Sequence, residues 1–221
     1  MNEEATTKLT DITARITRAA IVAKRDPAEV TLIAVSKTRT ADEIVPLIAA
    51  GQRDFGENRV QEAQGKWPAL MEANPNVRLH LIGQLQSNKA EDAVATAHAI
   101  HGVDRPSLVT ALGHAMDKIG KRPACFIQVN LADEPQKGGC AVADLPDLLK
   151  LALQADLPVI GLMCVPPADL EPSPWFALLA KLARDHGLPS ISMGMSGDFE
   201  SAVKLGSTHI RVGTALFGER A

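Results

Sequence analysis

The chain has 221 residues, of which 46% are hydrophobic and 22% are charged, the composition of a folded globular protein. Its net charge of −3 argues against a nucleic-acid-binding protein, which would normally be basic. No run of about 18 apolar residues is present, which argues against a membrane-spanning helix. The polar start of the chain lacks the apolar core of a signal peptide, and we therefore expect a cytoplasmic protein.

The cysteines and histidines predict neither a disulfide framework nor a metal site. Cys125, Cys140 and Cys164 are odd in number and widely spaced, so we expect free thiols. Cys125 and Cys164 lie inside apolar runs, which is more typical of buried structural cysteines than of nucleophiles. The six histidines show no spacing typical of metal ligands.

Apolar residues at helical spacing in residues 2–25 predict an amphipathic helix that Asp26-Pro27 ends. Short apolar runs then predict eight strands, at residues 31–37, 54–57, 78–83, 100–104, 124–130, 159–165, 190–193 and 209–213. Helical patterns separate them, at residues 41–50, 58–71, 88–97, 106–119, 143–154, 174–186 and 197–205. A last helix begins in residues 214–217, although little chain remains for it.

This alternation of strands and helices predicts parallel strands joined by crossover helices. An open doubly wound sheet and a closed barrel both have that order. Eight strand–helix units in about 200 residues favour the barrel, and no GxGxxG sequence follows the first strand. We therefore expect an α/β fold with a single domain over residues 1–221. It would be a (β/α)8 TIM-type barrel with an extra N-terminal helix, residues 1–26, packed over the gap at the last helix or on the barrel floor.

The first candidate functional residue is Lys37, at the end of the first predicted strand, because functional groups in such barrels lie at the carboxyl ends of strands. Alternation along the strand places Lys37 on the same face as Ile33 and Val35. If that face points inward, poor solvation would lower the pKa of Lys37 and make its amine nucleophilic. A lysine that reaches solvent is the alternative and is the more frequent case for this feature alone.

The loops after the seventh and eighth predicted strands have the composition of a phosphate site. Residues 194–197 (GMSG) precede a predicted helix, and Gly213-Thr214 begins the next one. Glycines, hydroxyls and helix N-termini offer donors to an anion, and barrels often bind phosphate between these two loops. The same residue types are common in ordinary turns and helix caps, so the loops alone leave both interpretations open.

Arg211 lies two residues before Gly213 in the eighth predicted strand. An inward arginine would need an acceptor such as a bound ligand, an outward one would be solvated, and alternation does not decide between them. A reactive lysine, a phosphate cradle and a nearby arginine together predict a pyridoxal 5′-phosphate (PLP) site with a Schiff base on Lys37. A Schiff-base aldolase is the second interpretation, but its lysine would be expected late in the barrel, with acidic partners on several strands.

Several motifs resemble those of a known family. They are LIAVSKT at 32–38, FGEN at 55–58, VQE at 60–62, HLIGQLQSNK at 80–89, HGVD at 101–104, QVN at 128–130, KG at 137–138, GLM at 161–163, SMGMSGD at 192–198 and GSTHIRVGTALFG at 206–218. Over essentially residues 30–218, the chain resembles the YggS/PROSC family of pyridoxal phosphate homeostasis proteins.

This resemblance implies a barrel like the N-terminal domain of alanine racemase, with PLP as the cofactor. Lys37 would carry the Schiff base, the loops after the last two strands would hold the phosphate, Arg211 would face the pyridine nitrogen and Asn58 would line the cofactor. One departure is Arg59, where relatives often carry Tyr. The cofactor-binding residues that the resemblance implies are Lys37, Asn58, Met195, Ser196, Arg211, Gly213 and Thr214.

The resemblance further implies a protein without established catalytic activity, which binds, buffers and hands over PLP and so affects amino-acid and keto-acid balance. We expect a monomer that has PLP-dependent apo-enzymes as acceptors and binds neither nucleic acid nor membrane. An amino-acid racemase or another PLP-dependent enzyme is the alternative. Racemisation needs a second base, a Tyr in alanine racemase, and this chain has no Tyr and no residues left for a second domain. A purely structural scaffold would leave Lys37 and the two loops unexplained.

Overall fold

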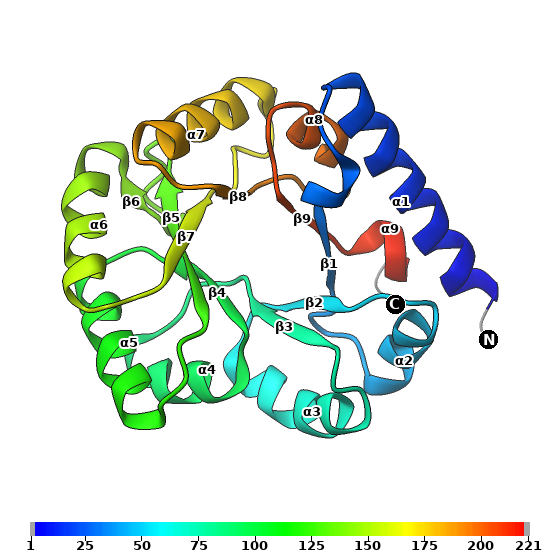
Figure 1. Ribbon diagram of the computed structural model, residues 1–221, viewed down its shortest axis with the longest axis horizontal. Coiled ribbons are helices and arrows are strands. Elements are labelled where there is room, and N and C mark those ends of the chain that lie inside the picture. The colour runs from blue at the N-terminus through cyan, green and yellow to red at the C-terminus, as the bar shows by residue number, and fades with distance from the viewer. Residues whose placement is uncertain (1–2, 219–221) are drawn as a thin grey trace.

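The computed structural model describes residues 3–218. Within that range, eight parallel strands form a closed ring in the order β1-β2-β3-β4-β5-β7-β8-β9, and β9 pairs with β1 to close it. Figure 1 shows this ring of strands surrounded by helices. The expected α/β barrel is therefore confirmed, and the open sheet is excluded.

The barrel strands lie close to their predicted positions. Their bounds are β1 Thr31–Val35, β2 Asp54–Glu57, β3 Arg78–Leu81, β4 Ala99–Val103, β5 Ala124–Asn130, β7 Val159–Met163, β8 Ser190–Ser192 and β9 His209–Val212. Among the described residues there is one further strand, β6 (Cys140–Ala141), which pairs with β5 outside the ring and was not predicted.

The helices alternate with the strands as expected. Their bounds are α1 Glu3–Val22, α2 Ala41–Ala49, α3 Val60–Ala73, α4 Ala90–Thr96, α5 Pro106–Ile119, α6 Leu145–Gln154, α7 Ser173–Asp185, α8 Phe199–Lys204 and α9 Thr214–Phe217. Four of them begin two residues later than predicted: α3 at Val60, α4 at Ala90, α6 at Leu145 and α8 at Phe199. The residues just before α3 and α8 are therefore loop residues at the carboxyl ends of β2 and β8.

Helix α1 fills the place of a full eighth barrel helix. The helix that follows β9, α9, has only four residues, and α1 packs against both α9 and α8 (Figure 1). Ile12 and Ile16 of α1 are buried, and Arg15 forms an ion pair of 3.0 Å with Glu200 of α8. Of the two positions expected for this helix, the structure has the first, over the gap at the last helix.

The end of α1 differs from the prediction. The helix ends at Val22, before Asp26-Pro27, and Lys24 beyond it adopts a left-handed conformation with φ of 57°. Asp26 instead caps a short 3-10 helix, Pro27–Glu29, by accepting a hydrogen bond of 2.9 Å from the Ala28 N–H. The chain thus turns into β1 through a capped turn.

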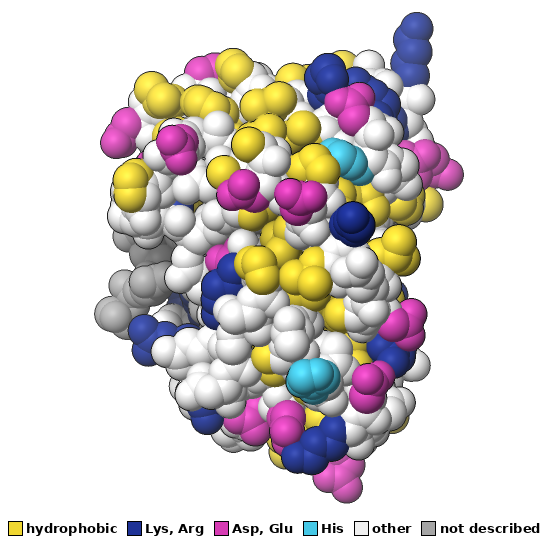
Figure 2. Space-filling model, turned by 90° about the vertical axis from the view of Figure 1, so that its left-hand side faces the viewer, with side chains coloured by type: hydrophobic (Ala, Val, Ile, Leu, Met, Phe, Trp, Pro, Cys, Tyr) yellow, Lys and Arg dark blue, Asp and Glu magenta, His cyan; other side chains and the backbone are white. Residues whose placement is uncertain are grey.

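The surface mixes apolar with charged side chains (Figure 2), and the cysteines are buried. Within residues 3–218, no helix has the length and apolar character needed to cross a membrane. On the face shown in Figure 2, which carries α6 and α7, apolar side chains lie among acidic and basic ones. All three cysteines are free and buried, and burial raises the pKa of Cys125 and Cys164 to about 12. Their thiols stay protonated at neutral pH, so the expectation of buried structural cysteines is confirmed.

Candidate functional site

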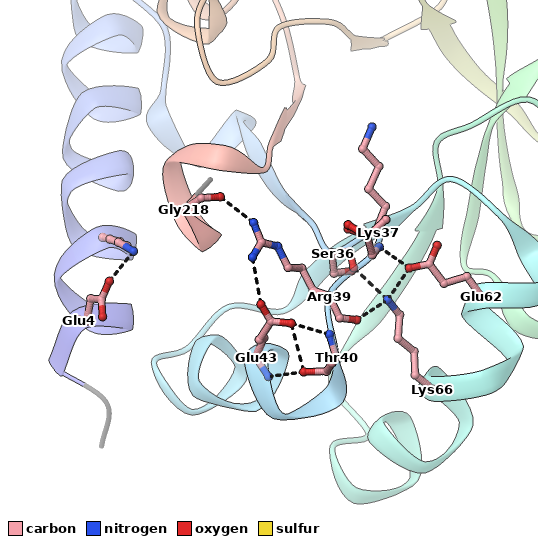
Figure 3. A network of polar contacts seen from close by, with 11 residues as sticks. Glu4, Ser36, Lys37, Arg39, Thr40, Glu43, Glu62, Lys66 and Gly218 are labelled. Atoms are coloured by element: carbon pink, nitrogen blue, oxygen red, sulfur yellow. Dashed lines mark hydrogen bonds and ion pairs between the residues drawn. The ribbon is translucent and has the colours of Figure 1, made fainter. Parts of the chain in front are cut away.

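Lys37 follows β1 in a turn that polar contacts hold from outside the barrel mouth (Figure 3). Thr38 has a φ of 64°, a left-handed conformation that costs free energy for a residue other than glycine. The Thr38 N–H donates to the carboxylate of Glu62, and the Lys66 ammonium donates to the Ser36 carbonyl at 2.9 Å. The side chain of Lys37 extends away from these contacts in Figure 3.

A buried carboxylate, Glu57 at the end of β2, holds the same turn from inside. Its Oε1 accepts hydrogen bonds from the Ser36 hydroxyl at 2.6 Å and from the Trp67 indole at 3.0 Å. The same oxygen lies 2.8 Å from Lys66 Nζ. Because a buried charge must be paired to be tolerated, these contacts join β1, β2 and α3 into one corner. The turn that presents Lys37 is therefore set by residues that do not line the pocket.

Lys37 lies in a pocket of about 460 Å³ at the carboxyl ends of the strands. The residues that line it come from the ends of β1, β2, β3, β7, β8 and β9. They are Val35, Lys37, Asn58, Ile82, Val165, Met195, Ser196, Gly197, Arg211, Gly213 and Thr214. The seven residues expected to bind a cofactor are all among them, so the fold brings the whole predicted set together.

The loops after β8 and β9 meet on one side of this pocket. The Ser196 hydroxyl accepts a hydrogen bond of 3.2 Å from the Gly213 N–H, which joins the two loops. Within residues 3–218, the backbone N–H groups of Ser196, Gly197 and Thr214 donate to no acceptor, and no acidic side chain lines the pocket. The Asp198 carboxylate in the same loop accepts from the Met195 N–H, and the unused donors beside it fit an anion such as a phosphate group.

The predicted contribution of helix N-termini to this anion site is wrong in part. Helix α8 begins at Phe199, two residues after Gly197, and α9 has only four residues. The predicted start of a helix at Gly213-Thr214 is confirmed by α9, but a helix of four residues has almost no macrodipole and adds little to the binding of an anion. The donors of these loops are individual N–H groups and hydroxyls.

Arg211 points into the barrel, which settles the orientation that the sequence left open. Its side chain is buried, with Nη1 donating to the Ser192 hydroxyl at 2.6 Å and Nη2 donating to the Cys164 carbonyl at 2.9 Å. Burial lowers the pKa of the guanidinium, yet an arginine remains charged at neutral pH. Within the described part of the chain, Arg211 forms no ion pair, and it is one of the residues that line the pocket.

Arg59, the residue at which the motifs depart from the family, lies outside this pocket. It lines a separate cavity of about 730 Å³, whereas its neighbour Asn58 lines the pocket of Lys37. The other residues around this second cavity are mainly polar or basic: Val60, Gln61, Gln84, Leu85, Gln86, Lys89 and Arg105. The substitution therefore changes the charge beside the pocket and leaves the pocket wall unaltered.

Comparison with known proteins places this barrel in a family. The family model described as alanine racemase, N-terminal domain, matches residues 8–221. The pyridoxal phosphate homeostasis protein of Pseudomonas aeruginosa is 41% identical, over 95% of this chain and 93% of the relative. That of Escherichia coli K12 is 37% identical, over 96% of this chain and 95% of the relative. The chain belongs to the pyridoxal phosphate homeostasis protein family.

Solved structures agree with this membership in the homeostasis protein family. PipY of Synechococcus elongatus PCC7942 has been solved without PLP, with 41% identity, a TM-score of 0.81 and coverage of 92% of this chain and 99% of that chain. It has also been solved with PLP bound. That structure has 40% identity and a TM-score of 0.77, and the match covers 92% of this chain and 100% of that chain. Alanine racemase of Clostridium difficile 630 matches with a TM-score of 0.75 at 10% identity, over 99% of this chain and 57% of that one, which shows a shared barrel fold alone.

Sequence reasoning missed the residues that hold the Lys37 turn. Glu57 was assigned only to a strand end, and Lys66 was not singled out. One signal was available, because Glu62 and Lys66 are four residues apart on a predicted helix, a spacing that brings opposite charges together. Nothing local indicated that the same lysine would also reach β1.

Proposed function

We propose that this protein binds PLP in the pocket of Lys37 and acts in PLP homeostasis by buffering the cofactor and handing it over. The observation that carries the proposal is the meeting of Lys37, the two donor-rich loops and Arg211 in one pocket. The proposal is supported by the 40% identity to PipY, whose structure holds PLP. It is also supported by the names of the relatives from Pseudomonas aeruginosa and Escherichia coli.

The pocket offers a candidate partner for the aldehyde, the phosphate and the ring nitrogen of the cofactor. PLP supplies an aldehyde, a phosphate dianion and a pyridine nitrogen when it is bound. We assign the Schiff base to Lys37 and the phosphate to the N–H groups and hydroxyls at Ser196 and Thr214. We assign the ring nitrogen to Arg211, which as a permanent donor keeps that nitrogen unprotonated. The remaining proposed cofactor-binding residues complete the wall: Asn58, Met195 and Gly213.

We also propose that the protein does not act as an amino-acid racemase. Racemisation requires a proton acceptor on one face of Cα and a proton donor on the other. Lys37 is a candidate for one of these roles, but the chain has no Tyr, and no His, Asp or Glu lines the pocket. An unprotonated ring nitrogen also makes the cofactor a weaker electron sink, which a racemase tolerates because two bases flank Cα, and here Lys37 has no Tyr as its partner. We therefore expect this protein to hand its PLP to PLP-dependent apo-enzymes rather than to convert amino acids.

The Schiff base is tested by absorption spectroscopy with and without borohydride, followed by mass mapping of the reduced lysine. We expect a yellow protein whose reduced adduct lies on Lys37. The Lys37→Ala variant should lose the band of the Schiff base while the phosphate loops retain weaker binding. An adduct on another lysine, such as Lys89 or Lys137, would contradict the assignment.

The homeostasis role is tested by measuring the transfer of PLP to an apo-enzyme and the turnover of amino acids. Loaded protein mixed with an apo-aminotransferase should restore the activity of that enzyme, and the Lys37→Ala protein should restore less. With L-alanine and other amino acids, we expect at most slow side reactions. A racemisation or transamination kcat of roughly 1–10³ per second, the usual range for enzymes, would favour the enzyme alternative instead.

A further inference from the structure

A line of buried polar side chains crosses the interior of the barrel and ends at Arg211. His80 Nε2 lies 2.9 Å from Asp54 Oδ1, and His80 Nδ1 lies 3.0 Å from His101 Nε2. His101 Nδ1 lies 2.9 Å from the Ser192 hydroxyl, which in turn accepts from Arg211 at 2.6 Å. The five residues come from β2, β3, β4, β8 and β9, and none is more than 7% exposed.

The two ends of this line fix the direction of its hydrogen bonds. At one end, Arg211 can only donate, so the Ser192 oxygen accepts and its own proton is free for His101 Nδ1. At the other end, a carboxylate can only accept, so His80 must donate to Asp54 through Nε2. With one proton on each imidazole, His101 then donates through Nε2 to His80 Nδ1. Every bond in the line therefore points from Arg211 towards Asp54.

The surroundings favour this protonation. Burial favours the neutral form of Asp54, but hydrogen bonds from His80 and Arg78 outweigh it and lower the pKa of the carboxyl. Burial holds the pKa of His101 well below its usual value, so that imidazole carries one proton at neutral pH. These surroundings favour a charged acid at one end of the line and a neutral His101 in its middle. The line also requires a single proton on His80, which the NMR experiment below measures directly.

We propose that Ser192, His101 and His80 form a positioning relay that holds the Arg211 guanidinium against the ring of the bound cofactor. The proposal rests on the proposed function, since it assumes that a pyridine ring lies beside Arg211. Within residues 3–218, Arg211 forms no ion pair: its hydrogen bonds go to the Ser192 hydroxyl and the Cys164 carbonyl, and the charge of Asp198 acts on it only at a distance. The relay connects Arg211 to the distant carboxylate of Asp54. Hydrogen bonds in such a line polarise one another in a low-dielectric interior, so each bond strengthens the next.

The relay begins where the barrel meets solvent on the side away from the pocket. Asp54 and Arg78 are the first residues of β2 and β3, and their side chains form an ion pair of 2.7 Å. Arg78 is 58% exposed, so this end is open to water. The line thus connects the amino ends of the strands with the pocket at their carboxyl ends.

The first test needs no cofactor. In protein labelled with nitrogen-15 in histidine, NMR of the apo-protein at neutral pH should show His101 as the Nε2–H form with Nδ1 unprotonated. His80 should show the same form. A proton on Nδ1 of His101, or two protons on His80, would reverse the bonds and overturn the relay.

The second test measures the effect on the cofactor. Ser192→Ala removes one buried oxygen, and His101→Phe removes the relay but retains a ring beside Phe126, on which His101 stacks at 4.2 Å. The matched control is His209→Phe. The ring of His209 lies 6.0 Å from that of His101, but its only side-chain hydrogen bond among the described residues is to Thr208, outside the relay. Thermal unfolding of all three variants gives the structural cost separately.

Both relay variants should shift the absorption maximum of bound PLP and raise its dissociation constant about tenfold, the loss expected for one hydrogen bond to a charged group. The His209→Phe control should shift neither. Unchanged spectra and affinities in the relay variants, or equal changes in the control, would overturn the relay. If the wild-type protein forms no borohydride-stable adduct on Lys37, the proposed function fails instead, and the NMR result still stands.

Discussion

Lys66 shows how a residue outside the pocket can determine the position of one inside it. Its ammonium, on a side chain only 12% exposed, lies 2.8 Å from the fully buried Glu57 and also donates to carbonyls on both sides of the Lys37 turn, at Ser36 and Arg39. Removal of one partner of a buried pair leaves an uncompensated charge, which costs more than the pair contributed. The free energy of unfolding and the geometry of Lys37 are therefore coupled at this residue.

We predict that Lys66→Met lowers the free energy of unfolding by about 3 kcal/mol and slows Schiff-base formation with PLP. The control is Lys118→Met, because Lys118 pairs with Glu91 at 2.8 Å while both side chains are more than half exposed. An exposed pair contributes at most about 1 kcal/mol, so this variant should behave as wild type. Urea titration and stopped-flow absorption measure the two quantities. Equal losses in both variants would show that burial is not what matters.

The hydroxyls of Ser196 and Thr214 give a second prediction at this scale. Hydrogen bonds to a charged group contribute about 1.5–3 kcal/mol each, so Ser196→Ala and Thr214→Ala together should weaken PLP binding at least tenfold. Pyridoxal, which lacks the phosphate, serves as the control ligand and should bind weakly to wild type and variant alike. Isothermal titration measures both. If the two ligands bind the wild-type protein equally well, the phosphate does not lie in these loops.

At the scale of elements, α1 should contribute to stability as a full barrel helix would, because it fills the place of one. Ile16 of α1 is 5% exposed, whereas Ile21, five residues further on and on another face of the helix, is 62% exposed. We predict that Ile16→Ala costs about 2–4 kcal/mol of unfolding free energy because it leaves a cavity against the barrel, and that Ile21→Ala changes it by less than about 0.5 kcal/mol. Calorimetry measures the difference. A small loss at Ile16 would mean that α1 is only loosely attached.

The elements that the sequence predicted well are those with a strong local pattern. The strands Asp54–Glu57 and Ala124–Asn130 and the helix Pro106–Ile119 have the predicted bounds, since turn residues and a proline mark their ends. The strand Cys140–Ala141 was missed because two residues carry no periodicity. The start of α3 was placed too early because Arg59, its N-cap, makes no side-chain cap hydrogen bond and so gave no signal.

At the scale of the whole molecule, the contacts that form only when the barrel closes are those that the sequence could not predict. Lys37 and the loop residues could be found because each ends a strand, and barrel topology brings strand ends together. The contact between His101 and Ser192 spans 91 residues and exists only once the barrel has closed. Alternation along single strands cannot reveal such a pair, which is why the relay to Arg211 followed from the structure alone.

The buried histidine cluster also makes the whole molecule sensitive to acid. Burial is the main cause that lowers the pKa of His209 to about 4, and the cations of Arg78 and Arg211 act in the same direction against the opposite effect of Asp54. An unfolded histidine has a pKa near 6.5, so the unfolded chain takes up a proton first as the pH falls. Stability is therefore complete above about pH 6.5 and decreases down to about pH 4, where both states are protonated.

We predict that the free energy of unfolding falls between pH 7 and pH 5, with His209 contributing about 2 kcal/mol of that loss. His209→Gln should reduce the loss, because glutamine does not titrate, while His186→Gln, at an exposed position, should leave it unchanged. Urea titrations at several pH values between 7.5 and 4.5 measure the slope for each variant, so any fixed cost of the substitution cancels. The same pH slope in His209→Gln and wild type would mean that water reaches the cluster and that His209 is not held in its neutral form.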